Sequence, residues 1–180
     1  AALVGYTNAG KSTLMNLLTN SAIAAEDKLF ATLDATTRRL NTAGSCHNIL
    51  ISDTVGFISN LPHHLVPSFR STLDVVRDAD LLIHVVDAAH PDREQHIATT
   101  VSVLEEIGAA DVPRLLVCNK SDLLTDAVDG LIIEKKHAPF IMLSAMHPDA
   151  GAALSGRIAD FFEKQSTTQT IKVPYSSCER

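Results

Sequence analysis

The segment from Gly5 to Ser12, GYTNAGKS, has the residue types and spacing of a loop that holds phosphate groups. Glycine at both ends lets the backbone curl so that successive N–H groups point at phosphate oxygens. Lys11 would neutralise β and γ phosphates, and Ser12 would offer its hydroxyl to magnesium. The motif has the context it requires, an apolar strand before it and the helical spacing LMNLL after it. The expected contacts are Gly5, Tyr6, Thr7, Asn8, Ala9, Gly10, Lys11, Ser12 and, on an α-phosphate oxygen, Thr13.

A second motif, Asp53-Thr54-Val55-Gly56, follows the apolar run NILIS. Its carboxylate would leave the sheet beside the phosphate loop and reach magnesium through water. Gly56 has no side chain to block its N–H from a γ-phosphate. Carboxylates at Asp34, Asp87 and Asp92 are rivals, and position and order along the chain favour Asp53.

A third motif, Asn119 to Asp122 (NKSD), follows the apolar run RLLVC. A carboxylate at Asp122 can accept from both the ring N–H and the 2-amino group of guanine. Adenine lacks that amino group and presents a ring acceptor instead. The motif therefore predicts a site that selects guanine and repels adenine.

Neighbouring residues would complete the base site. Asn119 would brace the adjacent loops, and the aliphatic stem of Lys120 would lie against the base. Ser144 and Ala145 follow the run FIML, where the Ala145 N–H would reach the guanine 6-oxo group and Ser144 would support the loop. The remaining expected contacts are Ser121 and Met146.

A loop over the nucleotide is expected between the first helix and the next strand, in LFATLDATT. Thr32 is the candidate for a second magnesium-binding hydroxyl. Thr36 and Thr37 are rivals, and all three could instead satisfy backbone groups in a turn. The expected contacts are Phe30, Ala31, Thr32, Leu33 and Asp34.

Short apolar runs alternate with segments of helical period along the chain, which predicts an α/β fold. With the phosphate loop, we expect a Ras-like P-loop NTPase with a mostly parallel sheet and helices on both faces. Gly108 would stop one helix, and a last helix would span about Ala150 to Lys164. Arg38 to Thr42 could add an edge strand. The other expected strands are Ala1 to Val4, Ile49 to Ser52, Leu81 to Val86, Arg114 to Cys118 and Phe140 to Leu143.

The composition is typical of one folded domain of 180 residues and 19.3 kDa. Hydrophobic residues make up 46%, and the longest nearly apolar stretch is far shorter than the roughly 20 residues that cross a bilayer. A net charge of −6 argues against a broad grip on a nucleic-acid backbone. Three cysteines without a CxxC pair fit a reducing cytosol. We therefore expect a cytoplasmic monomer without a membrane span.

Three stretches together resemble the HflX family of ribosome-associated GTPases: GYTNAGKSTL, LFATLDATTRR and DTVGFISNLPHHLVPSF. The resemblance covers nearly the whole chain. It implies binding to the large ribosomal subunit and a role in splitting or rescuing stalled ribosomes under stress. It also places Thr32 at the family's magnesium-binding threonine, while Ala35 departs from the proline commonly found after that aspartate.

In that family a separate N-terminal domain and a helical linker precede the nucleotide domain. The chain opens on AALVG without an initiating methionine, so we expect it to be an excised piece. Residues 1–165 would form the GTP-binding domain. Residues 166–180, including IKVPYSS, would form a linker and the start of a C-terminal region.

Phe57 stands where many regulatory GTPases have a glutamine that orients the attacking water, so we expect slow intrinsic hydrolysis. Asn8 resembles an asparagine that coordinates potassium in related GTPases, although it could simply brace its loop. The ribosome is the competing activator.

The expected activity is a GTP hydrolase switch with Mg²⁺ and a candidate K⁺ site, in which Lys11, Thr32 and Gly56 act on the γ-phosphate. One alternative is a GTP-binding module with negligible turnover. Another is a GTPase of ribosome assembly or RNA modification.

Overall fold

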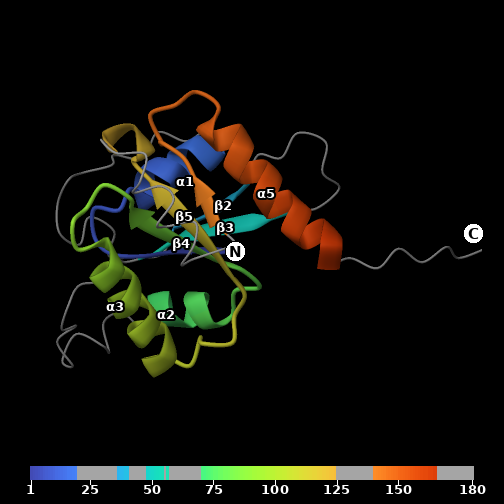
Figure 1. The fold of residues 1–180 in the computed structure, drawn as a ribbon. Helices are drawn as coiled ribbons and strands as arrows, with labels where there is room; N and C mark the ends of the chain where they lie inside the picture. The colour runs from blue at the N-terminus through green and yellow to red at the C-terminus, as the bar shows by residue number, and fades with distance from the viewer. Residues whose placement is uncertain (20–35, 41–47, 55, 57–69, 125–139, 166–180) are drawn as a thin grey trace, which may run out of the picture.

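The chain folds around a mixed β-sheet in a computed structural model that describes residues 1–19, 36–40, 48–54, 56, 70–124 and 140–165. Within these residues, six strands lie in the order β2-β3-β1-β4-β5-β6 (Figure 1). Neighbouring strands are parallel except β2 and β3, which are antiparallel. The strands are β1 (Ala2–Val4), β2 (Thr36–Arg39), β3 (Leu50–Asp53), β4 (Leu82–Asp87), β5 (Arg114–Asn119) and β6 (Phe140–Met142).

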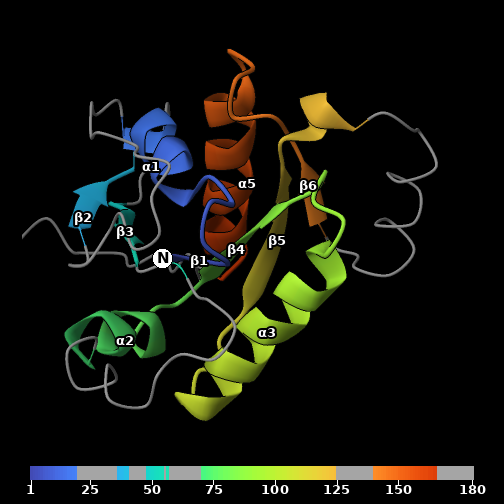
Figure 2. The same ribbon diagram turned by 90° about the vertical axis from the view of Figure 1, so that its left-hand side faces the viewer.

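Helices cover both faces of the sheet. One face carries α1 (Lys11–Thr19) and α5 (Ala150–Gln165), and the other carries α2 (Arg70–Arg77) and α3 (Arg93–Glu106) (Figure 1, Figure 2). A short 3-10 helix, η1 (Ser121–Leu123), follows β5. The layers confirm the predicted α/β class. Within the described part of the chain, no helix combines the length and the apolar character that a bilayer crossing requires.

Buried aliphatic side chains at helical spacing join each helix layer to the sheet. Leu14 and Leu18 of α1 and Leu154 and Ile158 of α5 are fully or almost fully buried on one face. Each side chain of this size stabilises the fold by about 1.5–3 kcal/mol when it is fully buried. The core on the opposite face contains Ala2, Val4, Val76, Leu82, Leu104 and Ala109.

The five strands predicted from apolar runs all form, and each of their ends differs from the prediction by at most one residue. The predicted edge strand was wrong in position, because β2 spans Thr36–Arg39 rather than Arg38 to Thr42. Its bounds follow its antiparallel register with β3, from Thr36 opposite Asp53 to Arg39 opposite Leu50, and not an apolar pattern. Residues 41 and 42 lie outside the described residues. The same holds for residues 166–180, which were predicted to form a linker and the start of a C-terminal region.

Helix ends follow the predicted signals. Gly108 adopts φ +75° just after α3, and the N–H of Ala109 donates to the Leu104 carbonyl at 2.8 Å. The last helix ends at Gln165, one residue beyond the prediction.

The parallel strands bring the three sequence motifs to one edge of the sheet. β1, β3, β4 and β5 all point the same way, so the residues that follow them meet at their carboxyl ends. The phosphate loop follows β1, Asp53 ends β3, and Asn119 ends β5. Segments more than 100 residues apart in the sequence therefore come into contact there.

Candidate functional site

Two glycines allow the phosphate loop to pack against its neighbours. Gly5 has φ +145°, and a Cβ there would lie 2.1 Å from the Val85 carbonyl oxygen. Gly10 has φ +96°, and a Cβ there would lie 2.3 Å from Nδ2 of Asn119. Any side chain at either position would therefore combine an unfavourable backbone conformation with a steric clash.

Lys11 begins α1 and is buried, with 6% of its surface exposed. Its Nζ donates to the backbone carbonyls of Gly5 at 3.1 Å and Tyr6 at 3.0 Å. Burial lowers the pKa of the ammonium from 10.5 to about 8, and the nearby Asp53 carboxylate partly opposes that shift. The site thus holds a desolvated cation whose interaction with an anion is weakly screened by water.

Ser12 and Asp53 meet beside this cation. The Ser12 hydroxyl donates to Oδ2 of Asp53 at 2.7 Å, and Asp53 is 2% exposed at the end of β3. A hydroxyl and a carboxylate are hard oxygen donors of the kind that magnesium prefers, and magnesium sites in proteins commonly use one or two such groups. The donor set therefore fits Mg²⁺.

Gly56 packs onto the phosphate loop. A Cβ at Gly56 would lie 2.9 Å from Cα of Thr7 and 3.1 Å from Nζ of Lys11. Glycine thus permits a close approach that the sequence pattern alone did not indicate. The buried Thr54 hydroxyl donates to the Leu3 carbonyl at 2.5 Å, so it is committed to the core.

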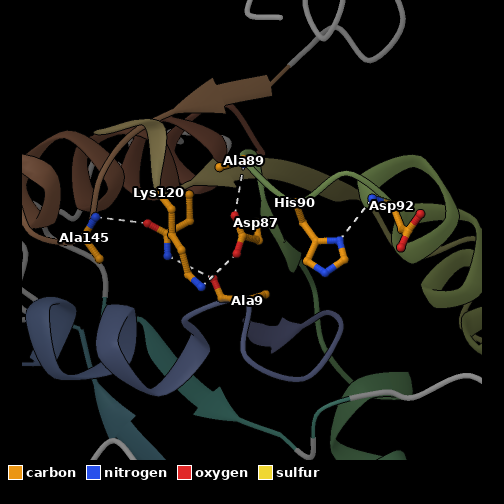
Figure 3. Close-up of polar contacts among 8 residues, drawn as sticks. Ala9, Asp87, Ala89, His90, Asp92, Lys120 and Ala145 are labelled. Atoms are coloured by element: carbon orange, nitrogen blue, oxygen red, sulfur yellow. Dashed lines mark hydrogen bonds and ion pairs between the residues drawn. The ribbon is translucent and has the colours of Figure 1, made fainter. Parts of the chain in front are cut away.

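The side chain of Asn119 joins the phosphate loop to the loop after β6. Nδ2 donates to the Ala9 carbonyl at 2.9 Å, and Oδ1 accepts from the Ala145 N–H at 3.0 Å. Figure 3 shows Ala9 and Ala145 on opposite sides of this link. The predicted bracing by Asn119 is confirmed, and so is that by Ser144, whose hydroxyl accepts from the Met146 N–H at 3.2 Å.

The Ala145 N–H already donates to Oδ1 of Asn119. Sequence reasoning missed this partner, because we expected that N–H to reach guanine. The loops after β5 and β6 together line a cavity of about 390 Å³. Lys120 and Ala145 do not line it, so the cavity borders the expected base site rather than enclosing it. Its lining residues include Ser121, Asp122, Ser144 and His147.

An ion pair joins Lys120 to Asp87, with Nζ and Oδ2 2.8 Å apart. Asp87 was a rival to Asp53, but its carboxylate faces Lys120, whereas Asp53 contacts Ser12. Sequence reasoning missed this pair, and it also missed the ring of Tyr6, which stacks on His96 of α3 with centroids 3.8 Å apart. Burial is the main cause that lowers the pKa of His96.

Several expected site residues lie outside the described residues: Phe30, Ala31, Thr32, Leu33, Asp34, Val55 and Phe57. Of the rivals of Thr32, Thr36 lies opposite Asp53 in the sheet register. The Thr37 hydroxyl hydrogen-bonds with that of Ser52 at 2.7 Å, which engages it within the sheet. Asn8 is exposed and adopts φ +60°. Among the described residues, no three His, Cys, Asp or Glu side chains form a metal-binding group.

A sequence profile of the family described as "50S ribosome-binding GTPase" matches residues 1–120. The chain is 51% identical over 175 residues to GTPase HflX from Gluconacetobacter diazotrophicus. That alignment covers 97% of this chain and 38% of that protein. The chain thus spans about two fifths of the length of the curated relatives it matches.

Solved structures show the same fold. A variant of Era from Aquifex aeolicus bound to GDP.AlF4- matches with a TM-score of 0.69 and 24% identity, covering 89% of this chain and 55% of that chain. NFeoB from S. thermophilus bound to GDP.AlF4- and K+ matches with a TM-score of 0.65 and 23% identity, covering 88% and 60%. By its phosphate loop, its sheet topology and these matches, the chain belongs to the 50S ribosome-binding GTPase family, and its domain is of the HflX type.

Proposed function

We propose that the chain binds GTP with Mg²⁺ and hydrolyses it to GDP and phosphate as a molecular switch. The observation that carries this proposal is the 2.7 Å contact between Ser12 and Asp53 beside the buried Lys11 ammonium. Ser12 would bind magnesium directly and Asp53 through water. Bound magnesium would neutralise charge on the β and γ phosphates.

The Lys11 ammonium would exchange its two carbonyl partners for phosphate oxygens. Two uncharged carbonyls compensate a buried charge less well than a polyphosphate does, which favours the exchange. The N–H of Gly56 would contact the γ-phosphate, and the hydroxyl of Thr32 would bind the magnesium ion that this phosphate holds. Loss of that phosphate would release both segments, which is how the switch would signal its state.

Guanine selection would rest on Asp122, whose carboxylate would accept from two N–H donors of guanine. Adenine would leave the carboxylate without those donors, at a cost of several kcal/mol. Lys120 would present its stem to the base. The Ala145 N–H would have to be shared between guanine and Asn119, because Asn119 already accepts from it.

Intrinsic turnover would be slow, because Phe57 cannot orient water. Potassium bound by Asn8 would supply charge to the transition state, and the exposed position of that side chain on the phosphate loop supports this role. The structurally similar NFeoB, which was solved bound to GDP.AlF4- and K+, supports it further. Phe57 equally favours the second candidate, a GTP-binding module with negligible turnover.

Single-turnover GTP hydrolysis in potassium and in sodium at equal ionic strength tests this proposal. Lys11→Ala serves as the blank and Asn8→Ala as the probe, with nucleotide binding measured in parallel. Hydrolysis that is faster in potassium and slower in Asn8→Ala is expected. GTP that is bound but hydrolysed only at the rate of the Lys11→Ala blank would instead establish a binding module.

The ribosomal role is supported by the family description and by the HflX relatives. We propose that the chain belongs to a longer protein that binds the large ribosomal subunit and splits or rescues stalled ribosomes. This longer protein is expected to co-sediment with purified large ribosomal subunits in the presence of GTP but not of GDP. Binding only to assembly intermediates would favour the role in ribosome assembly, and binding only to RNA substrates would favour RNA modification. The cytoplasmic location, the monomeric state and the domain boundary at residue 165 stay predictions.

A further inference from the structure

Asp87 is held between two partners at the edge of the sheet where the nucleotide motifs converge. Its Oδ2 lies 2.8 Å from Nζ of Lys120, and its Oδ1 accepts from the Ala89 N–H at 3.0 Å. The side chain is 17% exposed. Figure 3 shows the Lys120 side chain extending toward Asp87, so its ammonium lies at the end of β4.

The backbone around this pair is fixed as well. Asp87 lies opposite Asn119 in the register of β4 and β5, and the Ala88 N–H donates to the Asn119 carbonyl at 2.8 Å. Lys120 adopts φ +60°, a conformation that residues other than glycine rarely adopt. Both ends of the Lys120 side chain are therefore held, its Cα by an uncommon turn and its ammonium by Asp87.

We infer that Asp87 is a positioning residue for guanine-nucleotide binding, which orders Lys120 so that its aliphatic stem forms a preformed surface for the base. This inference rests on the proposed function, because it assigns Asp87 to the same nucleotide site. A free lysine side chain loses much rotamer entropy when it is fixed, and that loss weakens binding when it occurs on association. Asp87 imposes the order before the nucleotide arrives.

A purely structural role for the pair would have a different signature. Lys120 is 34% exposed, and partly exposed ion pairs contribute little to folding stability. Asn at position 87 retains an Oδ1 that can accept from the Ala89 N–H, so Asp87→Asn removes the charge and keeps the turn. The effect should therefore appear in nucleotide retention and not in the melting temperature.

The test measures release of a fluorescent GDP analogue after an unlabelled chase, together with the melting temperature. Asp87→Asn should release the analogue about tenfold faster and melt within a few degrees of the native chain. The single-turnover rate constant at saturating GTP should stay unchanged. The GTP concentration that gives half of that rate should rise, so the effect appears in KM and not in kcat. Asp92→Asn is the matched control, because Asp92 lies in the loop that joins β4 to α3 and the same change there should leave the release rate unaltered.

A double-mutant cycle with Lys120→Met separates positioning from other effects, because methionine keeps an unbranched stem and lacks the ammonium. Adding Asp87→Asn to Lys120→Met should produce no further acceleration. Equal acceleration in both backgrounds would overturn the inference, as would slower release from Asp87→Asn, which would mean that the pair competes with the nucleotide. If the native chain retains no GDP analogue, the proposed function fails and this inference fails with it. Native retention without an effect of Asp87→Asn overturns the inference alone.

Discussion

Replacing Lys11 by methionine should stabilise the protein without bound nucleotide while abolishing nucleotide binding. Burial lowers the pKa of Lys11 from 10.5 to about 8. Because one pKa unit corresponds to about 1.4 kcal/mol, the charged form costs the folded protein about 3 kcal/mol at neutral pH. Methionine avoids this cost, but it loses the two bonds to the carbonyls of Gly5 and Tyr6, worth about 1 kcal/mol each. The expected net gain at pH 7 is about 1 kcal/mol.

The pH dependence identifies the cause. The folded pKa of Lys11 lies below its unfolded value, so between pH 8 and pH 10.5 the unfolded chain binds more protons than the folded one. The free energy of unfolding of the native chain should therefore rise with pH in that window relative to Lys11→Met. Burial raises the pKa of the Cys118 thiol to about 11, but this contribution is common to both proteins and cancels.

Urea unfolding of both proteins after removal of nucleotide with EDTA, at several pH values from about 7 to 10, measures the difference. The stability advantage of Lys11→Met at pH 7 should shrink above pH 8 and then reverse. A difference that does not change with pH would refute the assignment of a buried, charged Lys11. So would a variant that is several kcal/mol less stable at pH 7.

Two further substitutions test the packing of the site. Asn119→Ala should destabilise the fold by about 2–4 kcal/mol in urea unfolding, because it leaves two backbone groups without their buried partner; a loss below about 0.5 kcal/mol would contradict the bracing role. Gly5→Ala should cost several kcal/mol, because its Cβ would meet the Val85 carbonyl, whereas Gly108→Ala, with no atom within 4 Å of its Cβ, should cost only about 1 kcal/mol. Equal losses at the two glycines would show that backbone conformation alone, and not the close contact, decides.

The central strands were predictable because strands covered on both faces read as nearly continuous apolar runs, interrupted in β4 by the buried His84. β4 is the clearest case, since Leu82 to Val86 are all buried. β2 was not placed correctly, because its residues TTRR are largely exposed and its extent depends on pairing with β3. The residue types within β2 do not indicate that pairing.

The candidate site likewise contains some features that the sequence could predict and others that depend on tertiary structure. Asn119 could be assigned a bracing role because its place in the motif puts a polar side chain between loops, where its amide needs partners. The pair formed by Asp87 and Lys120 depends on the register of β4 with β5 and on the left-handed backbone at Lys120. The link from Ala145 to Asn119 similarly requires the tertiary arrangement of two loops. These contacts arise from geometry that no spacing in the sequence encodes.

The proposed nucleotide site would bind magnesium where Ser12 meets Asp53 and select guanine through Asp122. Equilibrium binding of GDP and ADP, each with and without Mg²⁺, to the native chain and to Ser12→Ala tests it most directly. GDP should bind at least about 100-fold more tightly than ADP, and magnesium should strengthen GDP binding only when Ser12 is present. Equal affinity for GDP and ADP, or a magnesium effect that Ser12→Ala leaves unchanged, would contradict it.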